Sequence, residues 1–124
     1  MITEDYVSFE TAKLLKEKGF DEPTTKSYYT EGFENPMIFS HDLLPCIQTD
    51  EFLCPTLQMA MKWLREVHNI SIEPLVDFGS GDEYWWTADV GYIKKHGLID
   101  ELCGYNSYEE AAEVAIKYCL ENLI

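Results

Sequence analysis

Positive charge is scarce in this sequence. The 124 residues include nine Lys plus Arg against 23 Asp plus Glu, which gives a formal net charge of −14. Neither cation occurs between Lys26 and Lys62, nor between Arg65 and Lys94. Phosphate contacts need clustered cations and supply most of the affinity for nucleic acids, so we expect no direct binding to DNA or RNA. Binding to an anionic membrane surface is disfavoured for the same reason.

Long apolar runs and closely spaced cysteines are also missing. The apolar runs are too short for a transmembrane helix, and the N-terminal "MITEDYVSFE" has acids where a secretory signal has bases. We therefore expect a cytoplasmic protein whose cysteines are reduced thiols. Cys46 and Cys54 are too far apart for the C-x₂₋₄-C spacing that holds zinc, and Cys103 and Cys119 stand apart. The sequence thus predicts no metal site and no cofactor.

Apolar and aromatic residues are plentiful, at 46% and 14% of the chain. This supply is enough for a hydrophobic core, and the length fits one domain, so we expect a single domain over residues 1–124. Three helices are predicted. The first follows the cap residue Ser8 and ends at Gly19, the second begins at Pro55, and the third starts at the capping box formed by Ser107 and Glu110.

Apolar spacing predicts which faces of these helices are buried. The second helix should bury one stripe and the third another, where a cysteine acts as a small apolar residue. The expected buried residues are Leu57, Ala60, Met61, Leu64 and Val67 in the second helix and Ala112, Ala115, Ile116, Cys119 and Leu123 in the third.

Strands are expected between the helices. "TTKSYYTEGF" predicts a strand that runs into a turn at Glu31 and Gly32, and a short strand is expected near residues 37–39 within an otherwise irregular segment 33–54. "NISIEPLVDF" and "EYWWTADVGYI" predict two paired strands joined by "GSGD". The fold class is therefore α+β: an antiparallel sheet of three to four strands with about three helices, mainly on one face. A faint repeat of helix, break and strand occurs in residues 12–29 and 61–78.

Three segments carry a resemblance to other proteins: "SFETAKLLKEKGF", "CPTLQMAMKWLREVHNISIE" and "SYEEAAEVAIKYCLENLI". They are similar to segments of small hypothetical proteins from Bacteroides-type gut bacteria and their prophages or other mobile elements. In that group an "LPCPTQ"-like stretch often precedes the second segment, whereas here "LPC" and "CPTLQ" are separated. The resemblance implies an accessory protein of mobile DNA and carries no catalytic residues.

The stretch "DFGSGDEYWW" contains no phosphate-binding or kinase motif. A kinase needs a Gly-rich loop, a strand lysine and an H-R-D loop upstream of its "DFG", and none is present. "GSG" matches neither nucleotide-binding glycine pattern, and Asp77, Asp82 and Glu83 would repel an anion. A hairpin turn is the interpretation that the residues favour.

The aromatic residues near this turn are the candidate binding residues. Side chains alternate along a strand, so Tyr84 and Trp86 should face one side and Trp85 the other, and Tyr28 and Tyr29 should also face opposite sides. They either cover the edge of the core or form a surface for a partner, since exposed Trp and Tyr act as anchors at interfaces.

Catalytic residues cannot be chosen from this sequence. Four Cys, three His and 23 acids allow many combinations, and no local signature selects one. The leading hypothesis is a non-catalytic protein-binding or accessory module that binds a protein partner or associates with itself, for example as a homodimer. An alternative is an acidic decoy that occupies the nucleic-acid site of a host protein. A small enzyme is the third possibility.

Overall fold

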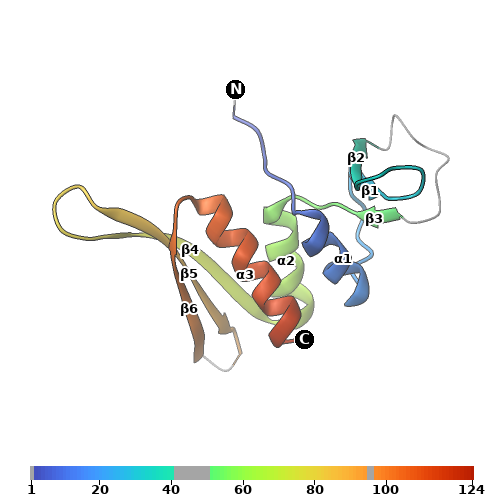
Figure 1. Cartoon of the computed structure of the whole chain (residues 1–124). Coiled ribbons are helices and arrows are strands. Elements are labelled where there is room, and N and C mark those ends of the chain that lie inside the picture. The colour runs from blue at the N-terminus through green and yellow to red at the C-terminus, as the bar shows by residue number, and fades with distance from the viewer. Residues whose placement is uncertain (1, 41–50, 95–96) are drawn as a thin grey trace. The chain divides into compact units, whose positions relative to one another are not determined.

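The computed structural model describes residues 2–40, 51–94 and 97–124, which form three helices and two three-stranded antiparallel sheets (Figure 1). The predicted α+β class is confirmed, with the strands divided between two sheets. The chain forms two compact units, Met1–Thr56 and Leu57–Ile124.

The first unit contains one helix and one sheet. Its elements are α1 (Phe9–Glu17), β1 (Lys26–Tyr29), β2 (Met37–Ser40) and β3 (Glu51–Leu53), and the strand order is β2-β1-β3. Helix α1 begins and ends as predicted. The Ser8 side chain accepts a hydrogen bond from the Thr11 N–H at the start, and Gly19 has a φ of 91° after the end.

The segment before α1 pairs with the end of this unit. Tyr6 forms an antiparallel bridge with Thr56, and the Val7 N–H donates to the Pro55 carbonyl at 3.1 Å. This pairing holds Pro55 and Thr56 outside the helix. Helix α2 therefore begins at Leu57, and the prediction that it begins at Pro55 was wrong by two residues.

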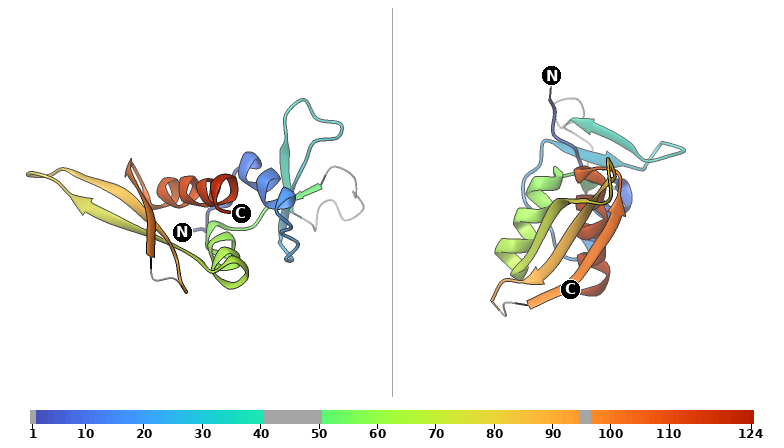
Figure 2. Two further views of the ribbon diagram at one scale, coloured as in Figure 1. Left: turned by 90° about the horizontal axis from the view of Figure 1, so that it is seen from below. Right: turned by 90° about the vertical axis from the view of Figure 1, so that its left-hand side faces the viewer.

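The second unit is a three-stranded meander with two helices. Its elements are α2 (Leu57–His68), β4 (Ile70–Phe78), β5 (Tyr84–Tyr92), β6 (Gly97–Tyr105) and α3 (Tyr108–Asn122), and the strand order is β4-β5-β6. Both helices lie on one face of this sheet, which the two views in Figure 2 show. The predicted arrangement of helices on one face holds for this unit.

Helix α2 buries four of its five predicted core residues. Leu57, Ala60, Met61 and Leu64 are buried, but Val67 is 53% exposed. Val67 lies in the last turn of the helix, beyond the part of this helix face that is buried. Trp63 is buried although it was not predicted to be.

Helix α3 starts at the predicted capping box. The Ser107 hydroxyl accepts from the Glu110 N–H at 3.1 Å, and the Glu110 carboxylate accepts from the N–H of Asn106, one residue before the cap. Four predicted core residues are buried and the fifth, Leu123, is half-buried. The buried residues of α3 are Ala111, Ala112, Ala115, Ile116, Cys119 and Leu120.

Each unit contains a helix followed by three antiparallel strands, which extends the helix–strand repeat seen in the sequence. The strand orders differ, however. The first of the three strands is central in the first unit, whereas the second of the three is central in the second unit. The two units therefore share an order of elements and not a sheet topology.

Candidate functional site: the tip of the β4–β5 hairpin

Strands β4 and β5 form a hairpin that is longer than the third strand beside it. Their pairing runs from Ile70 opposite Tyr92 to Phe78 opposite Tyr84, whereas β6 pairs with β5 only as far as Trp86. The last part of the hairpin is thus a two-stranded ribbon that projects beyond the helices of the second unit, as Figure 1 shows in yellow. We call the part from Asp77 to Trp85 the hairpin tip.

The turn at the hairpin tip forms as its residues predict. The Gly79 N–H donates to the Glu83 carbonyl at 2.9 Å, and the Glu83 N–H donates to the Ser80 carbonyl at 3.3 Å. Gly81 has a φ of 65°, which glycine adopts without a steric cost. The "GSGD" segment is therefore a chain reversal, as expected, and positions the residues on both sides of it.

Two aromatic side chains are exposed at the hairpin tip. Phe78 and Tyr84 are directly opposite each other in the register, and they are 78% and 63% exposed. Residues opposite each other in an antiparallel pair share a face, so both rings lie on the same side of the ribbon. Trp86 is on this face too, but its ring makes an edge contact with Tyr108 at the start of α3, with 5.9 Å between the ring centroids. The cover provided by the helices thus reaches Trp86 and not the tip.

Trp85 lies on the opposite face, as alternation predicts. It is half-buried, and its ring is so close to Gly79 that a Cβ there would be 3.0 Å from the ring. On the same face, the buried Thr87 hydroxyl donates to the Asp77 carboxylate at 2.8 Å. These contacts fix the two strands of the ribbon to each other within the hairpin tip and at its base.

Tyr28 and Tyr29, the other two candidate residues, belong to the first unit. The Tyr28 hydroxyl donates to the Val7 carbonyl at 2.8 Å, and its ring packs against Phe9. Tyr29 is only 2% exposed. Of the five aromatic residues singled out in the sequence, Tyr84 is the one whose side chain is mostly exposed, while Trp85, Trp86 and Tyr28 are half-buried.

Sequence reasoning missed Phe78, the more exposed ring of the pair. Its position in the sequence was the signal: Phe78, in "DFG", directly precedes the turn, and Tyr84 directly follows it. Pairing outward from a five-residue connection, Gly79–Glu83, would have placed Phe78 opposite Tyr84.

A row of three carboxylates crosses the face of the sheet that the helices do not cover. Glu73 in β4 is opposite Asp89 in β5, which is opposite Glu101 in β6. Like charges directly opposite each other are unfavourable in a sheet. The described residues of this face include no Lys or Arg, so the row gives the face a negative potential.

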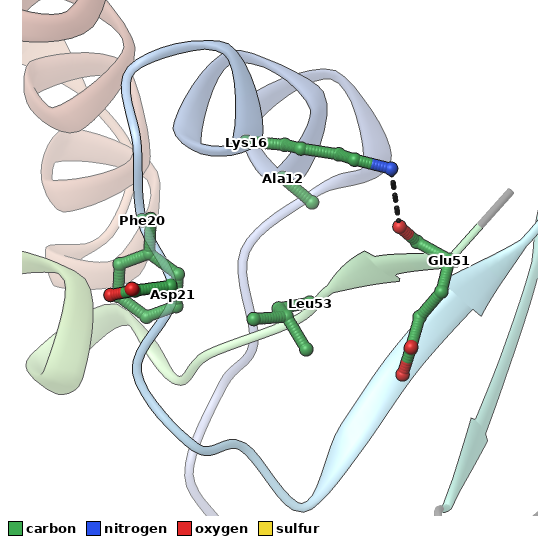
Figure 3. A pocket seen from close by; sticks show the side chains of 6 residues that line it. All are labelled: Ala12, Lys16, Phe20, Asp21, Glu51 and Leu53. Atoms are coloured by element: carbon green, nitrogen blue, oxygen red, sulfur yellow. Dashed lines mark hydrogen bonds between the residues drawn. The ribbon is translucent and has the colours of Figure 1, made fainter. Parts of the chain in front are cut away.

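The first unit has a small pocket, drawn in Figure 3. Its volume is about 120 Å³, and its lining is Ala12, Lys16, Phe20, Asp21, Glu51 and Leu53. The Lys16 ammonium donates to the Glu51 carbonyl at 2.9 Å and lies over the Phe52 ring, 4.6 Å from its centroid. The Glu51 carboxylate accepts from Ser27 Oγ at 2.7 Å and from the Tyr29 hydroxyl at 3.4 Å. These groups are occupied in holding α1 and the strands together.

The cysteine and histidine side chains of the described residues form no metal site. Cys54 and Cys119 are buried, Cys103 is exposed, and none of these three forms a disulfide, while Cys46 and His41 lie outside the described residues. Burial raises the pKa of Cys119 to about 12. The His68 ring packs edge-on against Trp63. Within residues 2–40, 51–94 and 97–124, no group of three or more His, Cys, Asp or Glu residues is placed to hold a metal ion.

The chain matches no model of a protein family, no curated protein and no solved structure. In the part of the chain that the structure describes, no helix has both the length and the apolar character needed to cross a membrane. Function must therefore be argued from the site itself.

Proposed function

We propose that this protein is a non-catalytic protein-binding module and that the hairpin tip is its recognition element. The observation that carries the proposal is the exposure of Phe78 and Tyr84, which are paired across a ribbon that the helices of the second unit do not cover. Exposed aromatic rings at a defined position are the side chains most enriched at the centres of protein interfaces.

The surroundings of the two rings indicate the chemistry of the partner. Asp82 and Glu83 lie in the turn beside them, and the whole chain has a net charge of −14. The partner that fits is a protein with an apolar pocket for the rings and Lys or Arg at its rim, because opposite charges speed and orient association. Self-association through this tip would bring the acids of two copies together, so a different protein fits better.

The resemblance to proteins of mobile elements fits the same proposal. An accessory protein encoded on mobile DNA can act by binding proteins of its host or of the element, and that role requires a binding surface. We also propose that this protein is encoded by a prophage or another mobile element.

A second candidate function is an acidic decoy for a nucleic-acid-binding protein. The row of Glu73, Asp89 and Glu101 favours it, because it concentrates negative charge on a face that has no described cation. A basic nucleic-acid site would accept such a face in place of phosphates, and salt would weaken the contact strongly. A small enzyme finds no support in the pocket of Figure 3, where Lys16 and Glu51 are taken up by the contacts described above.

The test is a capture experiment from a bacterial lysate with three tagged proteins. The first is the wild type, the second carries Phe78→Ser and Tyr84→Ser, and the third carries Val67→Ser, which changes an exposed apolar residue of α2. Bound proteins are quantified by mass spectrometry after washes at low and high salt. The proposal expects a protein that remains through high salt on the wild type and on Val67→Ser and is lost from the double variant.

Two other results would redirect the proposal. Nucleic-acid-binding proteins that wash off as salt rises, from all three baits alike, would favour the acidic decoy. The same bound proteins on all three baits through high salt would show that the hairpin tip is not the recognition element.

A further inference from the structure

We propose that the open edge of β6 accepts an extended segment of a partner protein as a fourth strand, with a Lys or Arg of that segment facing Glu101. The inference rests on the proposed function, since it specifies how a protein partner would be held. It concerns a different part of the second unit from the hairpin tip.

Strand β6 has a free edge. It pairs with β5 on one side, and within the described residues of this unit no strand pairs with its other side. The backbone N–H and C=O groups along such an edge can pair with a further strand, and proteins use this mode to recognise extended peptides. At nine residues, β6 is long for an edge strand.

The two edges of this sheet differ in how they are protected. The opposite edge, β4, contains Pro74, which cannot donate a hydrogen bond to a further strand. Strand β6, "GLIDELCGY", contains no Pro, Lys or Arg, and its edge is protected by the acids Asp100 and Glu101 and by two irregularities in its register with β5. These acids admit a basic segment, whereas Pro74 removes a backbone donor from β4 whatever the segment carries.

The middle of β6 is regular enough to pair. Irregularities in the register occur between Trp86 and Thr87 and between Val90 and Gly91 of β5. Between them the register is continuous, with Asp100 to Cys103 paired residue by residue. Within this stretch the Glu101 N–H donates to the Asp100 carboxylate at 2.8 Å, so this donor would have to exchange that bond before it could pair with an added strand.

Charge determines what kind of segment fits this edge. Glu101 is on the face that the helices do not cover, at the end of the row that begins with Glu73 and Asp89. The residue of an added strand opposite Glu101 would have its Cβ roughly 5 Å from that of Glu101. A Lys or Arg at that position would relieve the repulsion within the row. The exposed Cys103 and Leu98 on either side favour small or apolar neighbours for that cation.

A second copy of this chain is a poor occupant of the edge. An antiparallel pairing of two β6 strands centred on this stretch would place Glu101 close to the acids of the other copy. Each copy also has a net charge of −14, which opposes association over longer distances. A basic segment of a different protein would bring no acid close to Glu101, and the net negative charge of this chain would attract it.

The experiment uses the full chain as bait for a displayed library of random nine-residue segments. Selected peptides are then synthesised with a fluorescent label, and their binding to the wild type, Glu101→Lys and Glu73→Lys is measured by anisotropy. The two variants make the same change of charge in the same row, but only Glu101 borders the open edge. Hydrogen exchange of the β6 amides is measured with and without the best peptide.

We expect the selected peptides to share a Lys or Arg at one position. Glu101→Lys should weaken their binding by about tenfold or more, because it places like charges opposite each other at the pairing site, whereas Glu73→Lys should change it by less than about threefold. Exchange of the β6 amides should slow when the peptide is bound, since a fourth strand would protect them.

Any one of the following results would overturn the inference: no selected peptide, no basic residue enriched in the selected peptides, equal losses of binding in the two variants, or unchanged exchange of the β6 amides. Protection of β6 that needs only a second copy of the chain would also overturn it. Peptides that lose binding to the protein with Phe78→Ser and Tyr84→Ser, but not to Glu101→Lys, would overturn this inference and leave the proposed function standing. A protein partner that depends on neither site would count against both.

Discussion

Gly91 in β5 and Gly97 in β6 approach so closely that a Cβ on Gly91 would lie 2.6 Å from the Gly97 carbonyl oxygen. That oxygen belongs to the backbone and cannot turn aside as a side chain could. The approach occurs at an irregularity in the β5–β6 register, between Val90 and Gly91. The absence of a side chain at Gly91 is thus what lets β6 pair here, and β6 is the strand on which the proposed edge site depends.

Replacing Gly91 with alanine should therefore destabilise the protein. We expect Gly91→Ala to lower the free energy of unfolding by about 1–3 kcal/mol, as overpacking does elsewhere. Denaturant unfolding measures this change. The matched control is Ser71→Ala, since Ser71 is directly opposite Gly91 on β4 and is half-buried, and its change should stay within about 0.5 kcal/mol. Equal, small effects of the two substitutions would contradict the close approach.

Leu64 and Val67 provide a second matched pair, both assigned to the buried stripe of α2 by their spacing. Leu64 is fully buried and Val67 is 53% exposed. Leu64→Ala should lower the free energy of unfolding by about 2–5 kcal/mol, because it removes buried methyl groups and leaves a cavity. Val67→Ala should change it by less than about 0.5 kcal/mol. A loss of less than about 0.5 kcal/mol for Leu64→Ala would show that this face of α2 is not buried as described.

The sequence predicted the elements that have strong local signals. Both capped helix starts, at Ser8 and Ser107, are where the cap residues indicate, since a side-chain oxygen that accepts a backbone N–H acts over three residues. The β4–β5 hairpin was also predicted, because apolar strand residues flank a glycine-rich turn. Such signals depend on neighbours in the sequence and so can be recognised without the fold.

Two strands were missed because their signals are not local. Strand β3 has three residues, too few to show alternation. Strand β6 has nine, but its register with β5 shifts at two places, and Gly104, near one of them, has a φ of 94°. Each shift interrupts the alternation of faces, so "GLIDELCGY" does not read as a strand until its partner is known.

The candidate site was predicted in part for the same reason. Alternation correctly placed Trp85 on the face opposite Tyr84 and Trp86. The exposure of each ring, by contrast, depends on how far the helices extend over the sheet, and no local pattern reports that distance. Tyr29 and Tyr84 are both strand tyrosines in the sequence, yet one is in a core and the other is at the tip of a ribbon.

Tyr29 predicts a specific dependence on alkaline pH. Burial raises the pKa of Tyr29 above its ordinary value of 10.0, and the charge of Glu51 and a hydrogen bond to it raise it further. The folded state thus holds the phenol proton more tightly than the unfolded state does. The stabilisation is fully present below pH 10 and is lost as the pH rises through the folded-state pKa.

We therefore expect Tyr29→Phe to reduce the loss of stability between pH 9 and higher pH, relative to the wild type. At pH 7 the same substitution should cost about 1 kcal/mol, the usual contribution of one hydrogen bond. Denaturant unfolding at a series of pH values measures both effects. Tyr84→Phe is the control, since it makes the same change at an exposed tyrosine. Parallel pH profiles of the wild type and Tyr29→Phe would contradict the raised pKa of Tyr29.

Cys103 and Cys119 should differ in reactivity. The Cys103 side chain is exposed, whereas burial raises the pKa of Cys119 to about 12. The thiolate is the reactive form, so at pH 8 only about one in 10⁴ Cys119 side chains would be reactive, in addition to being inaccessible. We expect iodoacetamide at pH 8 to modify Cys103 in the native protein and to reach Cys54 and Cys119 only after unfolding. Peptide mapping by mass spectrometry follows each cysteine separately. Modification of native Cys119 at the rate of Cys103 would show that α3 does not bury this side chain and that the helices do not cover their face of the sheet as described.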